Sequence, residues 1–184
     1  KNNLETEGNT RISGQQVKLG TGSIYFDGTG DRIVIPHQEY QQLGTGEFTV
    51  ELFIYLTSTN SIQGFLGNDG WYFQIYLNEL ELAAGASAVI ERAWTHNINQ
   101  WYHLAVTRDS SNDFRIFVDG TQQGAVVNST ANLSHASNVF HIGNIGPGTS
   151  RFFAGGYMDE IRITKGFARY TSNFTVPTEA FANR

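Results

Sequence analysis

The stretch that decides the fold is Phe48–Thr57, which reads FTVELFIYLT. Every second residue is a large apolar one, in the order Phe48, Val50, Leu52, Ile54 and Leu56. Successive side chains of a β-strand point to opposite faces of the sheet, so this alternation has the period of a strand. The residues between them are Thr49, Glu51, Phe53, Tyr55 and Thr57. The stretch therefore predicts a strand with one dry face toward a core and one wetter face.

The same alternation recurs on both sides of this strand, whereas helical periodicity is almost absent. Further strands are predicted at Ser23–Phe26, Arg32–Pro36, Ile62–Leu66, Trp71–Leu77, Glu79–Ala83, Trp101–Arg108, Phe114–Val118, Val139–Ile142 and Tyr157–Thr164. Turn signals separate them. Asp119-Gly120 is a strong hairpin signal because both central residues of a type I′ turn need a positive φ. About ten short strands at this spacing predict an all-β sandwich of two antiparallel sheets.

Composition limits the classes of function. The 184 residues fit one sandwich domain, and the absence of cysteine excludes disulfides, a cysteine nucleophile and a cysteine metal site. The net charge is −5 with only 12 Lys and Arg, so there is no basic stripe to follow a phosphate backbone, and nucleic acid is a poor candidate partner. No apolar run approaches the roughly 18–20 residues that span a bilayer, which argues against membrane insertion.

The two ends of the chain differ from its middle. Residues 1–19 are polar and mostly unpatterned, and we expect a lead-in segment with at most one edge strand, followed by one domain over residues 20–184. Phe167–Phe181 carries aromatic residues without clear alternation and is predicted to wrap the outside of the sandwich. Because the chain begins with Lys1 and not with methionine, we expect it to be a module cut or processed from a larger protein.

Four phrases follow one another along the chain: SIYFDGTGD at 23–31, FTVE at 48–51, the pair WYHLAVTR and RIFVDG at 101–108 and 115–120, and YMDEIRI at 157–163. In this order and spacing they resemble the laminin-G-like jelly-roll domains of the concanavalin A-like lectin/glucanase superfamily, from about residue 20 to residue 181. The resemblance implies a concanavalin A-like jelly roll. The tail from Thr164 onward is similar to a version found in phage virion and tail-fibre proteins and in bacterial surface proteins. It implies an extracellular, virion or cell-surface location.

That superfamily contains lectins, adhesion modules and glycoside hydrolases, so the fold alone does not choose the function. A glycosidase needs two carboxylates that flank the scissile bond. Related hydrolases carry acids at alternate positions of one strand, but here Glu51 is followed at those positions by Phe53 and Tyr55. Glu79 and Glu81 share a strand face, for which a solvated surface is the preferred interpretation. No serine elbow or histidine zinc motif is present, so we predict a protein that is not an enzyme.

Calcium is the one cofactor that the resemblance implies. Domains of this superfamily often hold a structural Ca²⁺ between the opening turn and the closing strand, and the matching positions are Asp27 or Asp31 and Asp159. Ca²⁺ takes six to eight oxygen ligands, many of them in loops. The alternative is that Asp27 caps its own turn and that Asp159 accepts hydrogen bonds from a neighbouring loop.

A sugar site needs aromatic rings that stack on C–H faces, with amides and carboxylates that satisfy hydroxyl groups. The predicted ligand-binding set offers this mix and consists of Trp94, His96, Arg92, Asn68, Asp69, Trp71 and Tyr72. Trp94 is predicted to be the main contact, because Glu91–Gln100 lacks alternation and is interpreted as a loop in which a tryptophan is exposed. Packing in the core or a hairpin is the alternative for Trp94. Trp101 matches a structural position of the family and is predicted to lie in the core.

Four aromatic residues fall on the non-core faces of predicted strands, either lining a concave groove or lying beneath another module: Phe53, Tyr55, Tyr72 and Tyr76. Taken together, the sequence predicts a non-catalytic binding module of a larger extracellular or virion protein, whose partner is a glycan or cell-surface polysaccharide. The alternative is a structural or protein-binding module that contacts other virion or surface-protein modules. A glycoside hydrolase is the third interpretation.

Overall fold

The alternating stretch of the sequence forms the middle strand of a sheet. In the computed structural model, which describes residues 4–134, 139–146 and 148–182, this strand is β5, Phe48–Leu56. It pairs antiparallel with β10, Trp101–Arg108, on one side and with β15, Gly156–Lys165, on the other. Its even-numbered apolar side chains are all fully buried. The predicted dry face is therefore confirmed.

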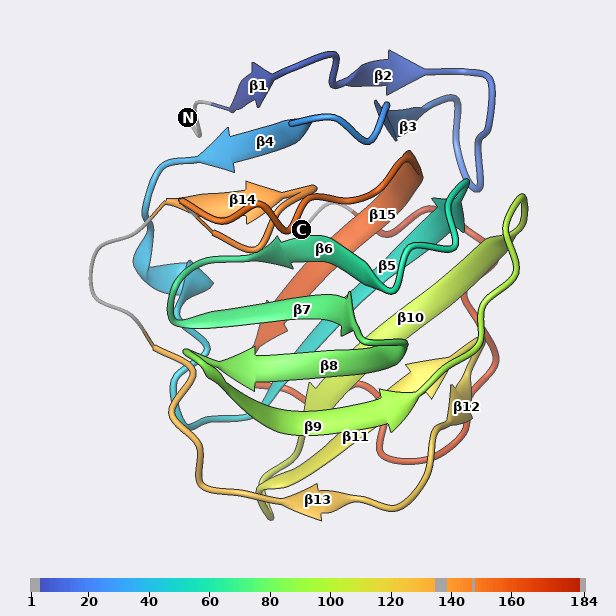
Figure 1. The fold of residues 1–184 in the computed structure, drawn as a ribbon. Helices are drawn as coiled ribbons and strands as arrows, with labels where there is room; N and C mark the ends of the chain where they lie inside the picture. The colour runs from blue at the N-terminus through green and yellow to red at the C-terminus, as the bar shows by residue number, and fades with distance from the viewer. Residues whose placement is uncertain (1–3, 135–138, 147, 183–184) are drawn as a thin grey trace.

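Two antiparallel sheets form a sandwich, as Figure 1 shows, and the predicted all-β class is confirmed. The back sheet has the strand order β12-β11-β10-β5-β15-β3-β2, and β13 also pairs with β11. Its other strands are β2 (Arg11–Ser13), β3 (Ser23–Phe26), β11 (Asp113–Val118), β12 (Thr121–Gln122) and β13 (Val127–Asn128).

The front sheet, which faces the viewer in Figure 1, has the order β1-β4-β14-β6-β7-β8-β9. Its strands are β1 (Glu5–Glu7), β4 (Arg32–Ile35), β6 (Ile62–Gly67), β7 (Trp71–Tyr76), β8 (Glu79–Ala84), β9 (Ser87–Ala93) and β14 (Phe140–Ile142). A short 3₁₀ turn, η1, covers Glu39–Gln41. In the described part of the chain, no helix has the length and apolar character needed to cross a membrane.

The core lies between the two sheets and is rich in aromatic rings. Phe65 packs edge-on against Phe73 and Phe153, with ring centroids 5.6 and 6.2 Å apart. Trp71 is fully buried, and its indole N–H donates to the backbone oxygen of Gln41 at 2.8 Å. Burying one side chain of this size contributes roughly 1.5–3 kcal/mol. The inner faces of both sheets are thus committed to packing, which leaves only the outer faces and the edges for binding.

The C-terminal segment 166–182 covers the outer face of the back sheet. The rings of Tyr170 and Phe174 stack at 3.5 Å, and Phe174 packs edge-on against His103 and Phe117. Farther along, the Phe181 ring lies 6.4 Å from the ring of Phe53. Figure 1 shows this red segment passing behind the back sheet, so the predicted wrapping of the tail is confirmed.

Glu51 is buried on this covered face and has a structural role. Its carboxylate accepts hydrogen bonds from the Tyr170 hydroxyl at 2.8 Å and Arg162 Nε at 2.8 Å, and lies 3.2 Å from His103 Nε2. Burial alone would raise the pKa of Glu51, but the hydrogen bonds from His103, Tyr170 and Arg162 outweigh it and hold the pKa below its ordinary value. Burial and the Glu51 charge in turn raise the pKa of Tyr170 to about 12.

Some strands differ from the sequence-based expectation. Residues 1–19 supply two edge strands, β1 and β2, one for each sheet, where at most one was expected. Strand β9 begins at Ser87 and reaches into the segment predicted to be a loop. Trp101 was predicted to lie in the core, but it pairs with Tyr55 in register and packs against its ring on the outer face, half-buried.

Candidate functional site

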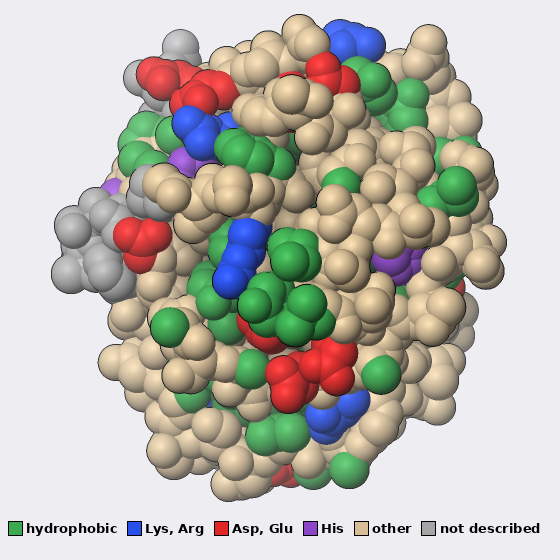
Figure 2. Space-filling model, viewed as in Figure 1, with side chains coloured by type: hydrophobic (Ala, Val, Ile, Leu, Met, Phe, Trp, Pro, Cys, Tyr) green, Lys and Arg blue, Asp and Glu red, His purple; other side chains and the backbone are tan. Residues whose placement is uncertain are grey.

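The outer face of the front sheet carries a polar and aromatic surface. Because Trp71, Phe73 and Ile75 of β7 point into the core, the alternate residues of this strand point outward. The outward residues of β7 are Tyr72, Gln74 and Tyr76, and across the ladder they face Ala83, Glu81 and Glu79 of β8. Figure 2 shows this face, with a basic group beside hydrophobic side chains at its centre and acidic groups next to them.

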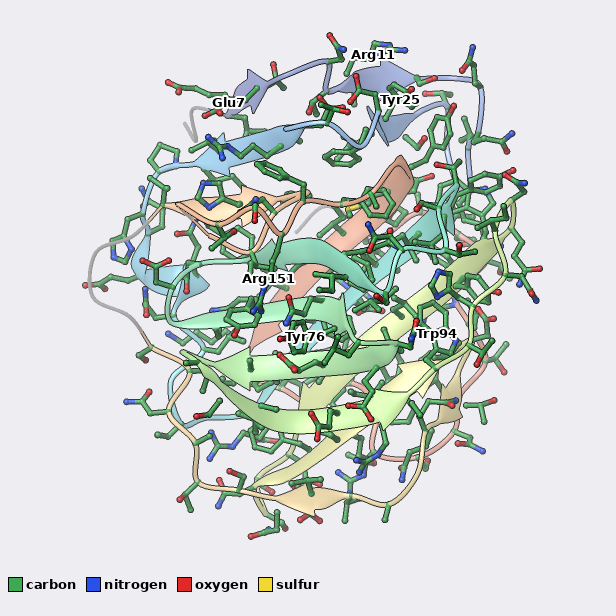
Figure 3. All side chains as sticks on the ribbon, viewed as in Figure 1. Glu7, Arg11, Tyr25, Tyr76, Trp94 and Arg151 are labelled. Carbon is green, nitrogen blue, oxygen red and sulfur yellow. The ribbon has the colours of Figure 1, made fainter. Side chains whose placement is uncertain are left out.

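The loop before β15 crosses this face and brings in Arg151. The backbone N–H of Gly64 donates to the oxygen of Phe152 at 3.2 Å, and a Cβ atom at Gly64 would lie 2.2 Å from the oxygen of Arg151. Only a glycine in β6 lets the loop approach so closely. The guanidinium of Arg151 lies 4.5 Å from the centroid of the Tyr76 ring, as Figure 3 illustrates, and Nη1 is 3.4 Å from Gln74 Oε1. This surface of Tyr72, Gln74, Tyr76, Glu81 and Arg151 is called the tyrosine platform below.

A buried polar pair lies in the floor of the platform. Gln74 is fully buried, and its Nε2 donates to Glu81 Oε1 at 2.8 Å, while Glu81 is 6% exposed. Glu81 stands directly opposite Glu91 of β9 in the ladder. Burial raises the pKa of Glu81, and the charges of Glu91 and Glu79 add to the rise against the hydrogen bond from Gln74. Burial and the Glu81 charge also raise the pKa of Tyr72, so its hydroxyl keeps its proton and can donate.

A hollow of about 370 Å³ borders the platform and is called the Arg151 hollow. Its lining consists of Asn68, Asp69, Tyr72, Gly85, Ala86, Ile145, Thr149 and Arg151. Asn68 is fully buried, and its Oδ1 accepts the backbone N–H groups of Gly70 and Trp71 at 2.8 and 3.1 Å. Its Nδ2 has no hydrogen-bond partner among the described residues. Leaving a buried amide donor unsatisfied costs on the order of 1–3 kcal/mol, and this donor atom is itself buried from solvent.

The structure divides the predicted ligand-binding set. Asn68, Asp69 and Tyr72 come together in the Arg151 hollow, with Asp69 exposed at its rim. Trp94 and His96 instead line a separate hollow of about 350 Å³, together with Thr59, Asn78 and Thr95. The two groups lie at opposite ends of β7, because Asn68 precedes the strand and Asn78 follows it.

Trp94 is not the exposed ring that the sequence predicted. It is 9% exposed and belongs to the hydrophobic core, with its ring edge-on to Tyr102 at 5.0 Å. Its backbone N–H donates to the oxygen of Asn78 at 3.0 Å, so the chain stays paired just beyond β9 and the ring turns inward. His96 is also buried, with Nε2 3.2 Å from the backbone oxygen of Ser58. The alternative of core packing for Trp94 is the correct one.

Trp71 and Arg92 belong to neither hollow. Trp71 is a core residue, as its buried indole shows. The Arg92 guanidinium donates to the backbone oxygens of Gln123, at 2.8 Å, and Ala125. It therefore ties the edge strand β9 to the loop after β12. The positions of Trp71 and Arg92 do not support their predicted role in ligand binding.

The three aspartates predicted to bind calcium do not form one cluster. Asp31 is fully buried and accepts the backbone N–H groups of Asn9 at 2.6 Å and Asp27 at 2.5 Å. Asp159 accepts the backbone N–H groups of Lys18 and Leu19 at 2.9 and 3.0 Å. Within residues 4–134, 139–146 and 148–182, no group of three or more His, Cys, Asp or Glu side chains is placed to hold a metal ion.

The donors around these aspartates agree with the alternative interpretation. Asp27 accepts the Thr29 N–H within its own turn at 2.8 Å, and Asn9 Nδ2 bonds its other oxygen at 2.5 Å. The hydrogen bond from Asn9, followed by that from Thr29, lowers the pKa of Asp27. The three aspartates thus do not fit a single calcium ion, and calcium binding as such stays a prediction.

Comparison with known proteins settles the family. The model of the family described as the concanavalin A-like lectin/glucanases superfamily matches residues 27–167, well over half of the chain. The chain belongs to this superfamily. No curated protein has a sequence that matches this concanavalin A-like domain.

Solved structures share its fold at low sequence identity. Domain 4 of AbnA, a GH43 extracellular arabinanase from Geobacillus stearothermophilus, in complex with arabinotriose, is similar with a TM-score of 0.67 and 16% identity over 90% of this chain and 82% of that one. The receptor-binding domain of botulinum neurotoxin C/D mosaic serotype has a TM-score of 0.64 and 12% identity over 91% of this chain and 44% of that one.

A third similar structure is a putative carbohydrate binding protein from Bacteroides ovatus, with a TM-score of 0.57 and 23% identity over 71% of this chain and 39% of that one. The concanavalin A-like domain thus spans less than half the length of the neurotoxin and Bacteroides chains. These neighbours are carbohydrate-binding or receptor-binding domains, and at this identity they establish the fold alone.

The sequence reasoning missed Arg151 and Gln74 as members of the site. Gln74 alternates with the core residues of β7, so the period-two pattern already placed it on the same face as Tyr72 and Tyr76. For Arg151 the only signal is the glycine-rich segment 143–156, in which it is the single charged residue. That composition indicates a close backbone approach, but does not say which face the loop crosses.

Proposed function

We propose that this domain is a non-catalytic carbohydrate-binding module and that the tyrosine platform, with the adjoining Arg151 hollow, is its sugar site. The observation that carries the proposal is the set of outward groups on the front sheet. Tyr72 and Tyr76 each stand two positions from Gln74 of the buried Gln74–Glu81 pair, one on either side, with the Arg151 guanidinium over the Tyr76 ring. Rings supply apolar faces for sugar C–H groups, and the Tyr72 hydroxyl and the Arg151 guanidinium supply polar groups for hydroxyls above the buried Gln74–Glu81 pair.

The charges on this face favour an uncharged sugar. Three carboxylates, those of Glu79, Glu81 and Glu91, lie on neighbouring positions of β8 and β9, near the guanidinium of Arg151. Like charges in proximity repel, and the effect is strongest where a bound sugar excludes water. We therefore expect neutral glycans to bind in preference to uronic or sialic acids. Support for a neutral ligand also comes from the similar domain 4 of AbnA, which was solved with arabinotriose.

The structures of similar fold support a binding role more than a catalytic one, since they include a toxin receptor-binding domain and a putative carbohydrate binding protein. Glu79 and Glu81, the acidic pair that the sequence offers for hydrolysis, alternate on β8, and Glu91 of β9 stands opposite Glu81. Glu81, however, is held against Gln74 in the floor of the platform. The similarity to a domain of an extracellular enzyme and to receptor-binding domains supports a location outside the cell or on a surface.

The test is binding to a panel of neutral and acidic oligosaccharides, followed by calorimetry on two matched variants. Tyr76→Ala removes the platform ring that lies under Arg151, at 4.5 Å. Tyr25→Ala is its control, because Tyr25 is a half-buried tyrosine of the back sheet that lies under Arg11 at 4.2 Å. We expect Tyr76→Ala to weaken binding of a neutral glycan at least tenfold and Tyr25→Ala to change it less than twofold.

Three outcomes would contradict the proposal. Equal losses in the two variants would place the ligand elsewhere. No detectable binding to any oligosaccharide of the panel, with or without calcium, would favour a structural or protein-binding module. Release of reducing ends that disappears in Glu81→Gln would show a hydrolase.

A further inference from the structure

A second group of side chains, away from the platform, gathers at the end of β15 on the back sheet. A β-bulge between Asp159 and Arg162 shifts the register, so that Arg162 faces Glu51 and Thr164 faces Thr49 on the outer side. Arg169 returns from the C-terminal segment, and its Nε donates to Thr164 Oγ1 at 2.9 Å. These residues border a hollow of about 410 Å³, which is called the basic hollow and is lined by Arg162, Ile163, Thr164, Lys165, Arg169 and Ala182.

Positive charge dominates the basic hollow. Among the described residues its lining includes three cations and no carboxylate, although the chain as a whole has 12 Lys and Arg against 17 Asp and Glu. The buried carboxylate of Glu51 lies behind the lining and is 2.8 Å from Arg162 Nη2 and 3.8 Å from Arg169 Nε. Within the described part of the chain, the Lys165 ammonium donates to the backbone oxygen of Glu39 alone, at 3.5 Å. Glu51 thus faces two of the three cations, and a net positive charge remains in the hollow.

Several donors of these arginines are still open. Arg162 uses Nε and Nη2 on Glu51, and Arg169 uses Nε on Thr164. Both Nη atoms of Arg169 have no hydrogen-bond partner within the described chain, and the Arg162 guanidinium lies 3.6 Å from the centroid of the Phe181 ring. A guanidinium presents its N–H groups as a planar fork that matches the oxygens of a carboxylate, sulfate or phosphate. The Glu51 network and the Thr164 bond hold both forks in place before any ligand arrives.

We propose that the basic hollow binds an oxyanion group, a sulfate, phosphate or carboxylate, carried by an acidic polysaccharide. The hollow is far larger than an inorganic anion, and Ala182 and the Phe181 ring, which lies 3.6 Å from the Arg162 guanidinium, add apolar surface beside the cations. A charged substituent on a sugar ring fits such a lining, with the anion on Arg169 and Lys165 and the ring against the apolar side. This site is independent of the tyrosine platform, which lies on the other sheet and has the opposite balance of charge.

The experiment is a calorimetric titration with a short sulfated dextran, with uncharged dextran of the same length and with oligogalacturonate. We expect the sulfated or the carboxylated oligosaccharide to bind, with an affinity that falls as salt is raised, and uncharged dextran to bind at least tenfold more weakly. The two acidic arms distinguish a sulfate-type oxyanion from a carboxylate. The Lys165→Gln/Arg169→Gln variant should weaken the binding at least tenfold, while Arg162 is left intact because it holds Glu51.

Matched controls separate a built site from general attraction. Arg11→Gln removes one exposed cation from the edge strand β2 and should change the affinity less than twofold. Lys165→Gln alone changes an exposed residue at the end of β15, so it tests the site even if the double variant fails to fold. Tyr76→Ala should leave binding of the acidic oligosaccharide unchanged, which keeps this result separate from the sugar site on the front sheet.

Other results would overturn the proposal. They are an equal loss in Arg11→Gln, full affinity in the Lys165 and Arg169 variants, equal binding of uncharged dextran, or no binding by either acidic oligosaccharide.

Discussion

The outer faces of the two sheets begin from similar sequence patterns and end in different states. On the back sheet, Phe53 and Glu51 alternate with core residues of β5 and lie beneath the C-terminal segment, which supplies Tyr170, Phe174 and Phe181. On the front sheet, Tyr72 and Tyr76 alternate with core residues of β7 in the same way. They lie on the face that Figure 2 shows open to solvent.

The comparison extends to one acid on each face. Glu51 accepts hydrogen bonds from partners of complementary chemistry, so its pKa is lowered. Glu81 shares its surroundings with Glu79 and Glu91, so its pKa is raised. On the covered face the charge of Glu51 is balanced by its partners, whereas on the open face three carboxylates stand near one another and the guanidinium of the loop residue Arg151 offsets the rise in the pKa of Glu81 only in part. This difference is our physical reason for placing the sugar site on the front sheet.

The largest expected effect comes from removing the charge of Glu51. Glu51→Gln leaves Arg162 and His103 without their anionic partner, and we expect the free energy of unfolding to fall by about 3 kcal/mol. Glu81→Gln relieves repulsion from Glu91, so the free energy of unfolding should change by less than about 0.5 kcal/mol or should increase. Urea unfolding of both variants at pH 7 measures the contrast. Equal losses of unfolding free energy in the two variants would show that the two acids have the same structural role.

The next largest effect on stability is expected from removing one aromatic ring on each outer face. Phe174→Ala removes a ring that packs on Tyr170, Phe117 and His103, and it should lower stability by about 2 kcal/mol, less than a fully buried phenylalanine because Phe174 is half-buried. Tyr76→Ala on the open face should cost less than about 1 kcal/mol. Calorimetric melting of the two variants compares the faces. A larger loss in Tyr76→Ala would mean that the platform is a packing surface.

The pH dependence of stability should show opposite signs for the two acids. The pKa of Glu51 lies below its ordinary value of 4.5, so its contribution is fully present above pH 4.5 and is lost as the pH falls through the lower folded-state value. The pKa of Glu81 lies above 4.5, so stability is lost as the pH rises from 4.5 through the raised value.

Unfolding measured from pH 3 to pH 7 tests both signs. Glu51→Gln should flatten the acid side of the stability profile, and Glu81→Gln should remove the decline above pH 4.5. The same profile in wild type and both variants would contradict the assignment of these shifts.

The smallest effect concerns the tip of the β7–β8 hairpin. Leu77 has a φ of 52° and is 61% exposed, so it occupies a left-handed conformation without burying its side chain. Asparagine tolerates this conformation better than leucine, so Leu77→Asn should raise stability by about 0.5 kcal/mol. Asn78→Leu, at the neighbouring position with a φ of 66°, should lower it. Thermal melts of this pair measure the difference, and a lower melting temperature for Leu77→Asn would show that the Leu77 side chain makes a stabilising contact.

Much of the fold was predictable because it depends on local alternation. Period-two patterns located β5, β7, β8, β10 and β15 to within a residue or two at each end. The tail was also predictable as an outer wrapping, because its aromatic residues need cover and show no strand pattern. The pattern could not say which sheet the tail covers, since that depends on partners such as Glu51 that lie far away in the sequence.

The candidate site was only partly predictable. Asn68, Asp69 and Tyr72 were placed correctly near one another because they share one hairpin. Trp94 was misplaced because a register shift between Leu82 and Ala83 disturbs the pairing of β9, and an edge strand with a bulge lacks the alternation that marks a strand. Arg151 arrives on a glycine-rich loop whose path is set by the bare backbone at Gly64, a tertiary fit that no periodicity encodes.

The central claim is that the open face of the front sheet binds a neutral glycan, and backbone amide chemical shifts test it most directly. A titration of the ¹⁵N-labelled domain with the best neutral ligand from the panel should perturb the amides of β7, β8 and residues 149–153, and leave β15 and the C-terminal segment unchanged. Perturbations centred on β15 and the tail, or on Trp94 and His96 alone, would contradict the claim.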